Sequence, residues 1–306
     1  MREDHTPAND SLLSATQLSA LGLAYEPFIT PKDAALLYND SHQEMSTNIV
    51  LKSLANEAKA IVLIAESGAG KTTFLRKILH ITHADIESCA CRIGAGQTFQ
   101  QISAKIKQKW SLPDGAEAPA ELSIENHVIC YLQKHPKLLL LIDDADQLDL
   151  ASLAQLLQLK HRIEQTHPHA LGLLMTGDHK LKLQIITLEE ANPSCSANYQ
   201  INIRPLNREQ THRYVRFRLS NAASDANHPA EDLLDHAALD AVYKASRGNF
   251  TKIHAASIEA LNQLQRRPLT QPPRKSTRLT AITIIGLVTI LVLLTCYLAV
   301  QLGIAY

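Results

Sequence analysis

One short segment of the sequence combines glycines with a lysine and two threonines. It reads Ala65, Glu66, Ser67, Gly68, Ala69, Gly70, Lys71, Thr72, Thr73. Small residues let backbone N–H groups curl around a phosphate, and a helix that begins at the end of the segment presents its positive end to the same anion. Lys71 is placed to reach the β- and γ-phosphates of a nucleotide, and the Thr72 hydroxyl is placed to reach Mg²⁺. Residues 66–73 are therefore predicted to bind a nucleotide as a P-loop; the alternative is a glycine-rich turn with a chance lysine.

The second chemical feature is a pair of acids, Asp143 and Asp144, directly after the apolar run 138–142. Four leucines and an isoleucine predict a buried strand, and ligands bind beyond the carboxyl ends of the strands in open α/β sheets. Asp143 is therefore the candidate for the shell of a Mg²⁺ ion, through water because Mg²⁺ loses its water reluctantly. Asp144 is the candidate for orienting an attacking water, and so for catalysis together with Lys71. The alternative for each acid is a helix cap or a solvated turn.

The elements that position these residues can be predicted from the hydrophobic pattern. Short apolar runs bounded by turn residues predict buried strands at 59–65, 86–93, 137–142 and 170–176. Helical spacing follows the P-loop up to residue 80 and recurs at 99–110, 124–134 and 150–165. Strands that alternate with helices predict an α/β fold, a parallel sheet with helices on both faces.

The pattern changes after about residue 204, where three helices are predicted with no apolar strand between them, at 208–220, 236–246 and 250–264. This change indicates a smaller helical domain behind the α/β domain. The predicted organisation is a mobile N-terminal segment at 1–20, an α/β domain at 21–204, a helical lid at 205–265, a basic proline-rich linker at 266–280 and a transmembrane helix at 281–303.

The transmembrane prediction depends on the run 281–300, which has no charged side chain over 20 residues. At about 1.5 Å per residue a helix of this length spans roughly 30 Å, the thickness of a bilayer core. Five cationic residues precede it with no acid among them: Arg266, Arg267, Arg274, Lys275, Arg278. Positive flanks stay on the cytoplasmic side, so the N-terminal part is predicted to be cytoplasmic. The alternative for 281–300 is a buried core helix.

Composition narrows the function further. The chain has 30 Lys and Arg against 30 Asp and Glu, a net charge of zero, which argues against a protein whose main task is to coat nucleic acid. Five cysteines without a repeated spacing argue against a disulfide framework. The 14 histidines lack the helix-face spacing that would predict a metal site.

With both motifs placed, the sequence resembles the ExeA/GspA-type AAA+ ATPases of bacterial envelope secretion. The segments that carry the resemblance are LGLAYEPF at 21–28, YNDSHQEM at 38–45, GAGKTT at 68–73, IDDADQL at 142–148, LGLLMTG at 171–177, RPL at 204–206 and THRYVRFRL at 211–219. They extend over roughly residues 20 to 265. The layout of a cytoplasmic ATPase-like domain before one span is also similar to DamX-type proteins, although no peptidoglycan-binding role is expected to carry over from them.

The resemblance implies an AAA+ P-loop fold with a helical lid, ATP and Mg²⁺ as cofactors, and a homo-oligomer. It also implies a single-pass protein of the bacterial inner membrane that acts with envelope or secretion-assembly proteins. By the same resemblance Thr176 or Asp178 stands where a sensor-1 residue is expected.

The lid departs from the family pattern, small-Gly-x-Pro-Arg, whose arginine senses the γ-phosphate. Here Phe250 stands in the place of the proline and Thr251 in the place of the arginine. Arg247 and Lys252 are the candidates to substitute for that arginine. The first P-loop glycine is also replaced, by Ala65. No arginine finger can be assigned among the four arginines of the first lid helix: Arg208, Arg213, Arg216, Arg218.

Three functions compete. The first is a membrane-anchored AAA+ protein that binds and hydrolyses ATP in envelope or secretion-system assembly. The second is a nucleotide-gated scaffold with weak or no hydrolysis, favoured by Ala65, by the altered lid and by Asp144, which is one methylene shorter than the glutamate of many such ATPases. The third is a DNA-handling AAA+ ATPase, against which the zero net charge and the membrane tether argue.

Overall fold

A computed structural model describes residues 12–29, 38, 41–57, 60–82, 85–112, 122–197, 199–224 and 230–266. The chain divides into two compact units, at 1–262 and 263–306, and the architecture that follows is that of the first. No helix among the described residues is long and apolar enough to cross a membrane. The predicted transmembrane segment 281–303 lies outside them, as do residues 267–280 of the predicted linker and the first eleven residues.

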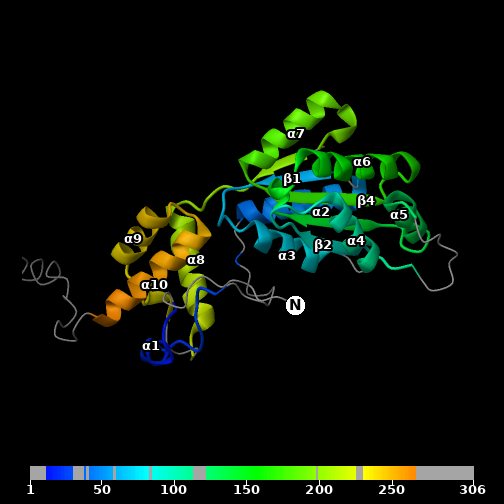
Figure 1. The fold of residues 1–306 in the computed structure, drawn as a ribbon. Helices are drawn as coiled ribbons and strands as arrows, with labels where there is room; N and C mark the ends of the chain where they lie inside the picture. Colours follow the sequence, from blue (N-terminus) through cyan, green and yellow to red (C-terminus); the bar gives the residue numbers. More distant parts are fainter. Residues whose placement is uncertain are drawn as a thin grey trace, which may run out of the picture. The chain divides into compact units, whose positions relative to one another are not determined.

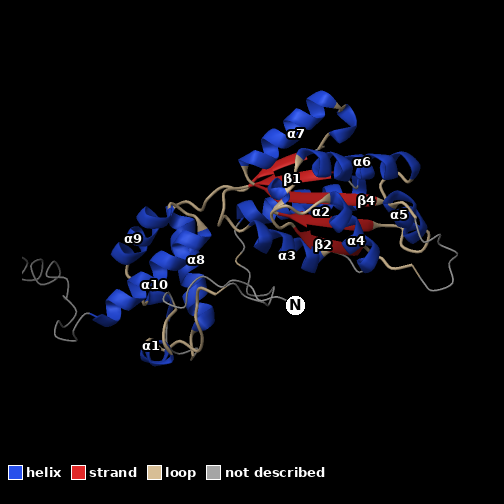
Figure 2. Cartoon of the chain, viewed as in Figure 1, coloured by secondary structure: helices blue, strands red, loops and turns tan. Residues whose placement is uncertain are grey.

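Five parallel strands form one sheet in the order β2-β3-β4-β1-β5 (Figures 1 and 2). Their bounds are β1 Ala60–Ile64, β2 Glu87–Arg92, β3 Leu138–Asp143, β4 Leu171–Gly177 and β5 Tyr199–Asn202. All pairings are parallel, so the five carboxyl ends meet at one edge of the sheet. The predicted parallel α/β sheet is confirmed.

Helices cover both faces of this sheet. One face packs against α2 (Ser41–Glu57) and α3 (Lys71–Ile81), through a cluster that includes Leu63, Leu139 and Leu141. The other face packs against α4 Phe99–Lys109, α5 Ile124–Leu132, α6 Leu150–Thr166 and α7 His179–Ala191. β1, β3 and β4 are buried along their whole lengths, which is why their sequences are apolar on both faces.

The remaining helices precede or follow this α/β layer. α1 (Ala15–Ala20) lies near the start of the chain, and α8 (Arg208–Ala222), α9 (His236–Ser246) and α10 (Phe250–Arg266) lie after the last strand. Short 3₁₀ turns occupy Ala145–Gln147, Pro193–Cys195 and Ala230–Asp232. We call α8–α10 the lid helices; the boundary predicted at 204/205 stays a prediction.

Three elements of the sheet layer were not predicted from the sequence, and one of them is α2, which packs on one face of the sheet. β5 was not predicted, because its four residues Tyr199–Asn202 are mostly exposed at the sheet edge and form no apolar run. α7 was not predicted either, although Asp178 caps it by accepting a hydrogen bond from Lys180 N at 2.8 Å. An edge strand and an amphipathic helix with a wide exposed face carry weaker signals than the central strands.

Candidate nucleotide-binding site

The P-loop connects β1 to α3 at the carboxyl edge of the sheet. Gly68 has φ +76° and Gly70 has φ +89°, values that side chains rarely tolerate. Gly70 is also the N-cap of α3 and makes no side-chain cap. An anion at this helix end would therefore meet N–H groups that no side chain of Gly70 satisfies, which is the geometry that binds phosphate.

Ala65 replaces the first glycine of the motif without backbone strain. It is not one of the three non-glycine residues with positive φ in the described part of the chain. Its side chain is buried, and its N–H donates to Gly177 O at 3.0 Å, which continues the pairing of β1 with β4. The backbone conformation at the end of the strand thus accommodates alanine. Ala65 is therefore no reason to regard the loop as degenerate.

Lys71 folds back over the P-loop. Its ammonium donates to Ala65 O at 3.0 Å and to Glu66 O at 3.3 Å, so the cation lies at the start of the loop. The cavity in front of the loop is lined by seven of the eight residues predicted to bind nucleotide, those from Ser67 to Thr73. Glu66 does not line it and meets Lys71 through its carbonyl.

Asp143 brings three predicted residues together. Its Oδ2 accepts a hydrogen bond from Thr72 Oγ1 at 2.6 Å, and its Oδ1 accepts one from Thr176 Oγ1 at 2.6 Å. The carboxylate is buried, with 5% of the residue exposed. The metal candidates Thr72 and Asp143 are thus in contact, and the sensor candidate Thr176 steadies the same acid.

This donor set fits Mg²⁺. The Thr72 hydroxyl and the Asp143 carboxylate supply the hard oxygen atoms that Mg²⁺ prefers. Across the described residues no group of three His, Cys, Asp or Glu could hold a metal. A Mg²⁺ ion here would therefore take its other oxygens from phosphate and water, as it commonly does.

Asp144 is held by a residue that the sequence analysis missed. Its Oδ2 accepts a hydrogen bond from Arg92 Nε at 3.1 Å, and its N–H donates to Thr176 Oγ1 at 3.3 Å. Arg92 is the last residue of β2 and lies opposite Asp143 in the register. Only the pairing of β2 with β3 places it there, so no local motif could have indicated it.

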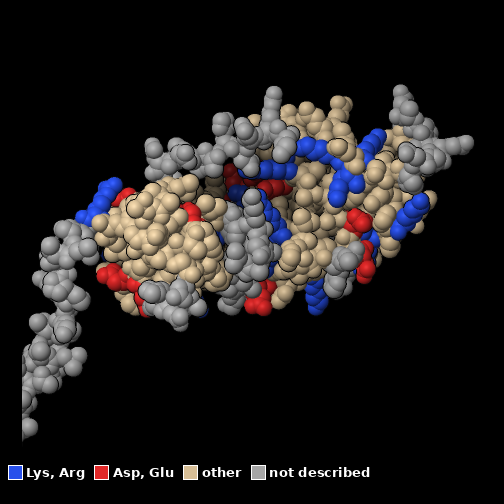
Figure 3. Space-filling model, turned by 90° about the horizontal axis from the view of Figure 1, so that it is seen from below, with Lys and Arg blue, Asp and Glu red and all other residues tan. Residues whose placement is uncertain are grey.

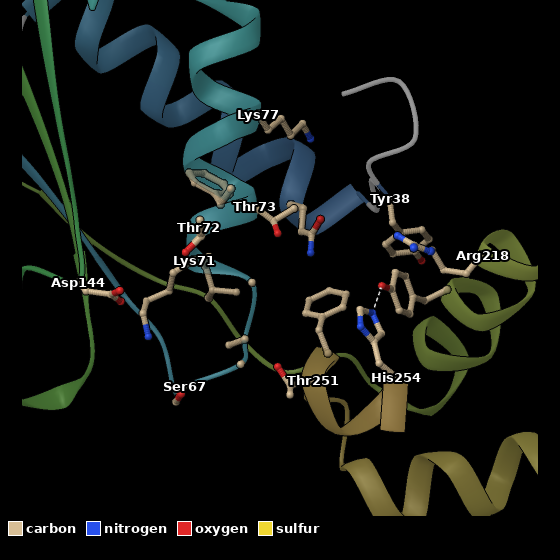
Figure 4. Close-up of a pocket in the computed structure, with 18 of the residues that line it drawn as sticks. Tyr38, Ser67, Lys71, Thr72, Thr73, Lys77, Asp144, Arg218, Thr251 and His254 are labelled. Carbon is tan, nitrogen blue, oxygen red and sulfur yellow. Dashed lines mark hydrogen bonds between the residues drawn. The ribbon is translucent and has the colours of Figure 1, made fainter. Parts of the chain in front are cut away.

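The lid helices supply the far wall of the cavity, whose volume is about 300 Å³ (Figure 4). This wall is aromatic: the Tyr214 ring lies 4.9 Å from that of Phe250 and 5.1 Å from that of Tyr38. Tyr214 Oη and His254 Nε2 are 2.5 Å apart. Burial raises the pKa of Tyr214 to about 12, and burial with the charge of Arg218 lowers the pKa of His254 to about 4. Both groups are therefore neutral at pH 7.

The other sensor candidates lie elsewhere. Arg247 ends α9 with φ +50° and is exposed, as is Lys252, and neither lines the cavity, whereas Thr251 does. Asp178 caps α7 and donates its N–H to Asp146 Oδ1 at 3.3 Å. Of the arginines of α8, Arg208 pairs with Asp240 through two 2.6 Å hydrogen bonds.

Arg218 is the only one of these four arginines that lines the cavity, and it anchors the N-terminal segment. Its guanidinium donates to Pro27 O at 2.6 Å and also to Ile29 O. Pro27 belongs to the segment 21–28 singled out in the sequence, and Ile29 directly follows it. An arginine finger acts on a neighbouring subunit's nucleotide, so these contacts leave its identity open.

A family model described as "AAA domain" matches residues 55–185, which include the P-loop, β3 and Asp143. The chain contains an AAA domain. With the five-stranded parallel sheet, its fold is the α/β P-loop fold of AAA+ ATPases. An AAA+ P-loop domain implies nucleotide binding, usually with Mg²⁺, and often an oligomer. No curated protein matches the sequence.

Solved structures with a similar fold include three archaeal proteins. Cdc6p from Pyrobaculum aerophilum aligns with a TM-score of 0.55 and 17% identity, over 83% of this chain and 65% of that one. The ORC2 protein of Aeropyrum pernix, in ADPNP and ADP complexes, aligns at 0.52 and 14%, over 76% and 68%. The ORC1 protein of the same organism, in complex with DNA, aligns at 0.51 and 14%, over 81% and 67%. The AAA domain thus shares their fold, and the chain spans less than two thirds of the Pyrobaculum protein.

Proposed function

We propose that this protein binds ATP with Mg²⁺ at the P-loop and hydrolyses it, as a membrane-anchored AAA+ protein that acts in envelope or secretion-system assembly. The observation that carries the ATP site is the contact of Thr72 with Asp143 at 2.6 Å beside the Lys71 ammonium. A hydroxyl, a buried acid and a cation at the head of a helix are the groups that a triphosphate and its metal require.

The roles of the residues follow from their positions. The N–H groups of Ser67 to Thr73 cradle the phosphates, and Lys71 leaves its two carbonyl partners to neutralise the β- and γ-phosphates. Thr72 and Asp143 hold the metal, which when bound stabilises charge that develops on the transferred phosphoryl group. Thr176 fixes the Asp143 carboxylate by its 2.6 Å hydrogen bond.

Hydrolysis further requires an oriented water, for which Asp144 is the candidate. Its backbone N–H is fixed by Thr176, and its carboxylate is fixed by Arg92, so its orientation is determined by two neighbours. Arg92 is 70% exposed in its side chain and can move away. We infer that Asp144 acts as the base once Arg92 releases it.

The membrane and envelope parts of the proposal have separate support. The uncharged segment 281–300 with its basic flank supports a single span with the AAA domain in the cytoplasm of a bacterium. The resemblance to ExeA/GspA-type proteins supports a partner in envelope or secretion assembly. An oligomer is supported by the AAA+ fold, whose sites commonly lie between subunits.

A nucleotide-gated scaffold is the second candidate. The pairing of Asp144 with Arg92 at 3.1 Å favours it, because a carboxylate held by a cation is not free to orient water. A carboxylate one methylene short of glutamate would also lie about an ångström from the ideal position, which can cost on the order of a hundredfold in rate.

A DNA-handling ATPase has less support. The likeness to the ORC1 protein in complex with DNA is one of fold at 14% identity. The net charge is zero, and basic and acidic side chains are interspersed on the face seen in Figure 3. DNA-binding domains instead gather positive charge on one face.

Phosphate release from Mg²⁺·ATP by the full chain in lipid nanodiscs separates the first two candidates. We expect turnover that disappears in Asp144→Asn, because an amide cannot accept the proton of the water. ATP binding without turnover in the wild type would favour the scaffold, and absence of binding would overturn both.

Fractionation of cells tests the membrane anchor. We expect the full chain in the membrane pellet after carbonate extraction, and a variant truncated after Arg278 in the supernatant. A full chain that is extracted by carbonate would contradict the anchor without affecting the ATP site.

A further inference from the structure

Residues 249–251, at the start of α10, bind the P-loop directly. Asn249 Nδ2 donates to Ser67 O at 2.8 Å, and Thr251 N donates to Gly68 O at 3.3 Å. The approach is so close that a Cβ on Gly68 would lie 2.7 Å from Asn249 Oδ1 and 2.7 Å from Thr251 Oγ1. The lid thus contacts the loop through neutral N–H groups that donate to loop carbonyls.

Asn249 uses both ends of its amide. Its Oδ1 accepts a hydrogen bond from Lys252 N at 3.4 Å, as a helix N-cap does, while its Nδ2 donates to the loop. The residue is 6% exposed. Of the side chains that cap helices well, only asparagine also carries an N–H donor with this reach, so the contact with Ser67 depends on the residue type.

The segment before Asn249 is rigidly fixed. Gly248 has φ +81°, and a Cβ there would lie 1.9 Å from Leu206 O. Leu206 N donates to Gly248 O at 3.0 Å, and Asn249 N donates to Ser246 O at 3.1 Å. The Asn249 backbone is therefore held in place independently of the P-loop.

Peptide geometry links these contacts to phosphate binding. In a planar trans peptide the C=O of one residue and the N–H of the next point in opposite directions. A hydrogen bond to Ser67 O therefore orients the N–H of Gly68, and one to Gly68 O orients the N–H of Ala69. The Ala69 N–H donates within the loop to Glu66 O at 3.2 Å, so the Gly68 N–H is the donor that these contacts turn towards the phosphates.

We infer that Asn249 is a positioning residue, which from the lid orients the N–H donors of the P-loop. The lid helices thereby respond to the conformation of the loop backbone and need no arginine at position 251. This inference rests on the proposed ATP binding. Because coupling is reciprocal, a nucleotide that orders the loop also strengthens the lid contacts. ATP and ADP share the phosphates nearest the loop, so both nucleotides should strengthen the lid contacts equally. A side chain that touched the γ-phosphate would instead favour ATP.

The test compares the affinities of Mg²⁺·ATPγS and Mg²⁺·ADP for the full chain in nanodiscs. In Asn249→Ser the cap is kept but the hydroxyl is too short to reach Ser67 O. We expect both affinities to fall by about fivefold, the order that loss of one hydrogen bond produces, with an unchanged ATPγS-to-ADP ratio. Asn207→Ser is the matched control, because it makes the same exchange at the N-cap of α8, where Asn207 accepts from Gln210 N at 2.8 Å and does not line the cavity, and it should bind both nucleotides as the wild type does.

A measurement on the wild type guards against misfolding of the variant. Either nucleotide should slow amide hydrogen exchange in a peptide covering 246–255 to the same extent. Protection by ATPγS alone, or wild-type affinities in Asn249→Ser, would overturn the inference. If the wild type binds neither nucleotide, the proposed function itself fails. If the wild type binds both nucleotides and Lys71→Ala binds neither, the proposed ATP site stands, and the Asn249→Ser result then decides the role of Asn249 alone.

Discussion

The two walls of the cavity are built on different principles. The P-loop wall is polar, and its Thr72 donates to the buried Asp143 behind it, which also accepts from Thr176, each at 2.6 Å. The lid wall is mainly aromatic, with Tyr214 and His254 uncharged at pH 7, and the guanidinium of its cation Arg218 is held by the carbonyls of Pro27 and Ile29. The difference indicates that the phosphates and the metal are recognised from the P-loop side, and that the lid contributes mainly shape and backbone contacts.

The largest expected effect is on the P-loop wall. Asp143→Ala removes the carboxylate that Thr72 and Thr176 contact, and we expect ATP turnover to fall by about 100-fold or more, because the metal loses its protein acid. Phosphate release measured against Mg²⁺ concentration would show it. Asp149→Asn is the control: this acid caps α6 by accepting from Ser152 N at 2.6 Å, and asparagine caps equally well. Equal losses in both variants would contradict a specific role for Asp143.

The lid wall should respond to acid. The pKa of His254 falls on folding from the unfolded value of 6.5 to about 4, because burial and the Arg218 charge disfavour imidazolium. The stabilisation is therefore complete above pH 6.5 and is lost as the pH falls towards 4. We expect up to about 3 kcal/mol of unfolding free energy to depend on this group. Urea unfolding from pH 7 to 4 would measure it.

The matched variant for that experiment is His254→Gln, which keeps a hydrogen-bonding partner for the Tyr214 hydroxyl and does not titrate. Its stability should fall less steeply than that of the wild type over the same pH interval. Parallel curves for the two proteins would mean that His254 is not the buried neutral group of the lid wall.

A smaller effect is expected at the water-orienting position. Asp144→Glu extends the carboxylate by one methylene, and we expect turnover to rise by about tenfold because the acid reaches further towards the phosphates. Steady-state phosphate release would measure the change, with Asp144→Asn as the inactive reference. A lower rate in Asp144→Glu than in the wild type would mean that the shorter side chain is already in position.

The smallest effect is expected where the family pattern would place a charge. Arg247→Ala and Lys252→Ala should each leave ATP affinity within about twofold, since exposed cations outside the cavity contribute little. Equilibrium titration with a fluorescent ATP analogue would measure the affinities of both variants. A larger loss in either variant would mean that this exposed cation reaches the bound nucleotide.

The sequence was sufficient for features that are local along the chain. The P-loop and Asp143 each follow a strongly apolar strand, so motif and position could be predicted together. Arg92, Asn249 and the aromatic wall depend on which strands and helices become neighbours. Arg92 reaches Asp144 only because β2 pairs with β3, and Asn249 reaches Ser67 across 182 positions of sequence. Tertiary contacts of this kind leave no periodic or spacing signal.

The departures of the sequence from the family pattern also acquire a physical meaning. Ala65 was the reason to suspect a degenerate loop, yet its backbone conformation accepts a side chain. Thr251 stands in the place of the expected arginine and donates its backbone N–H to Gly68 O. A replaced residue in a motif therefore has to be judged by the conformation and contacts of its position.

Equilibrium binding of ATP to the full chain in nanodiscs, with and without Mg²⁺, tests the central claim most directly. The wild type should bind with an affinity that Mg²⁺ increases, and Lys71→Ala should lose at least about 100-fold of it, because one desolvated charge facing the phosphates contributes about 3 kcal/mol. Equal affinity in the wild type and Lys71→Ala would contradict a nucleotide site at the P-loop.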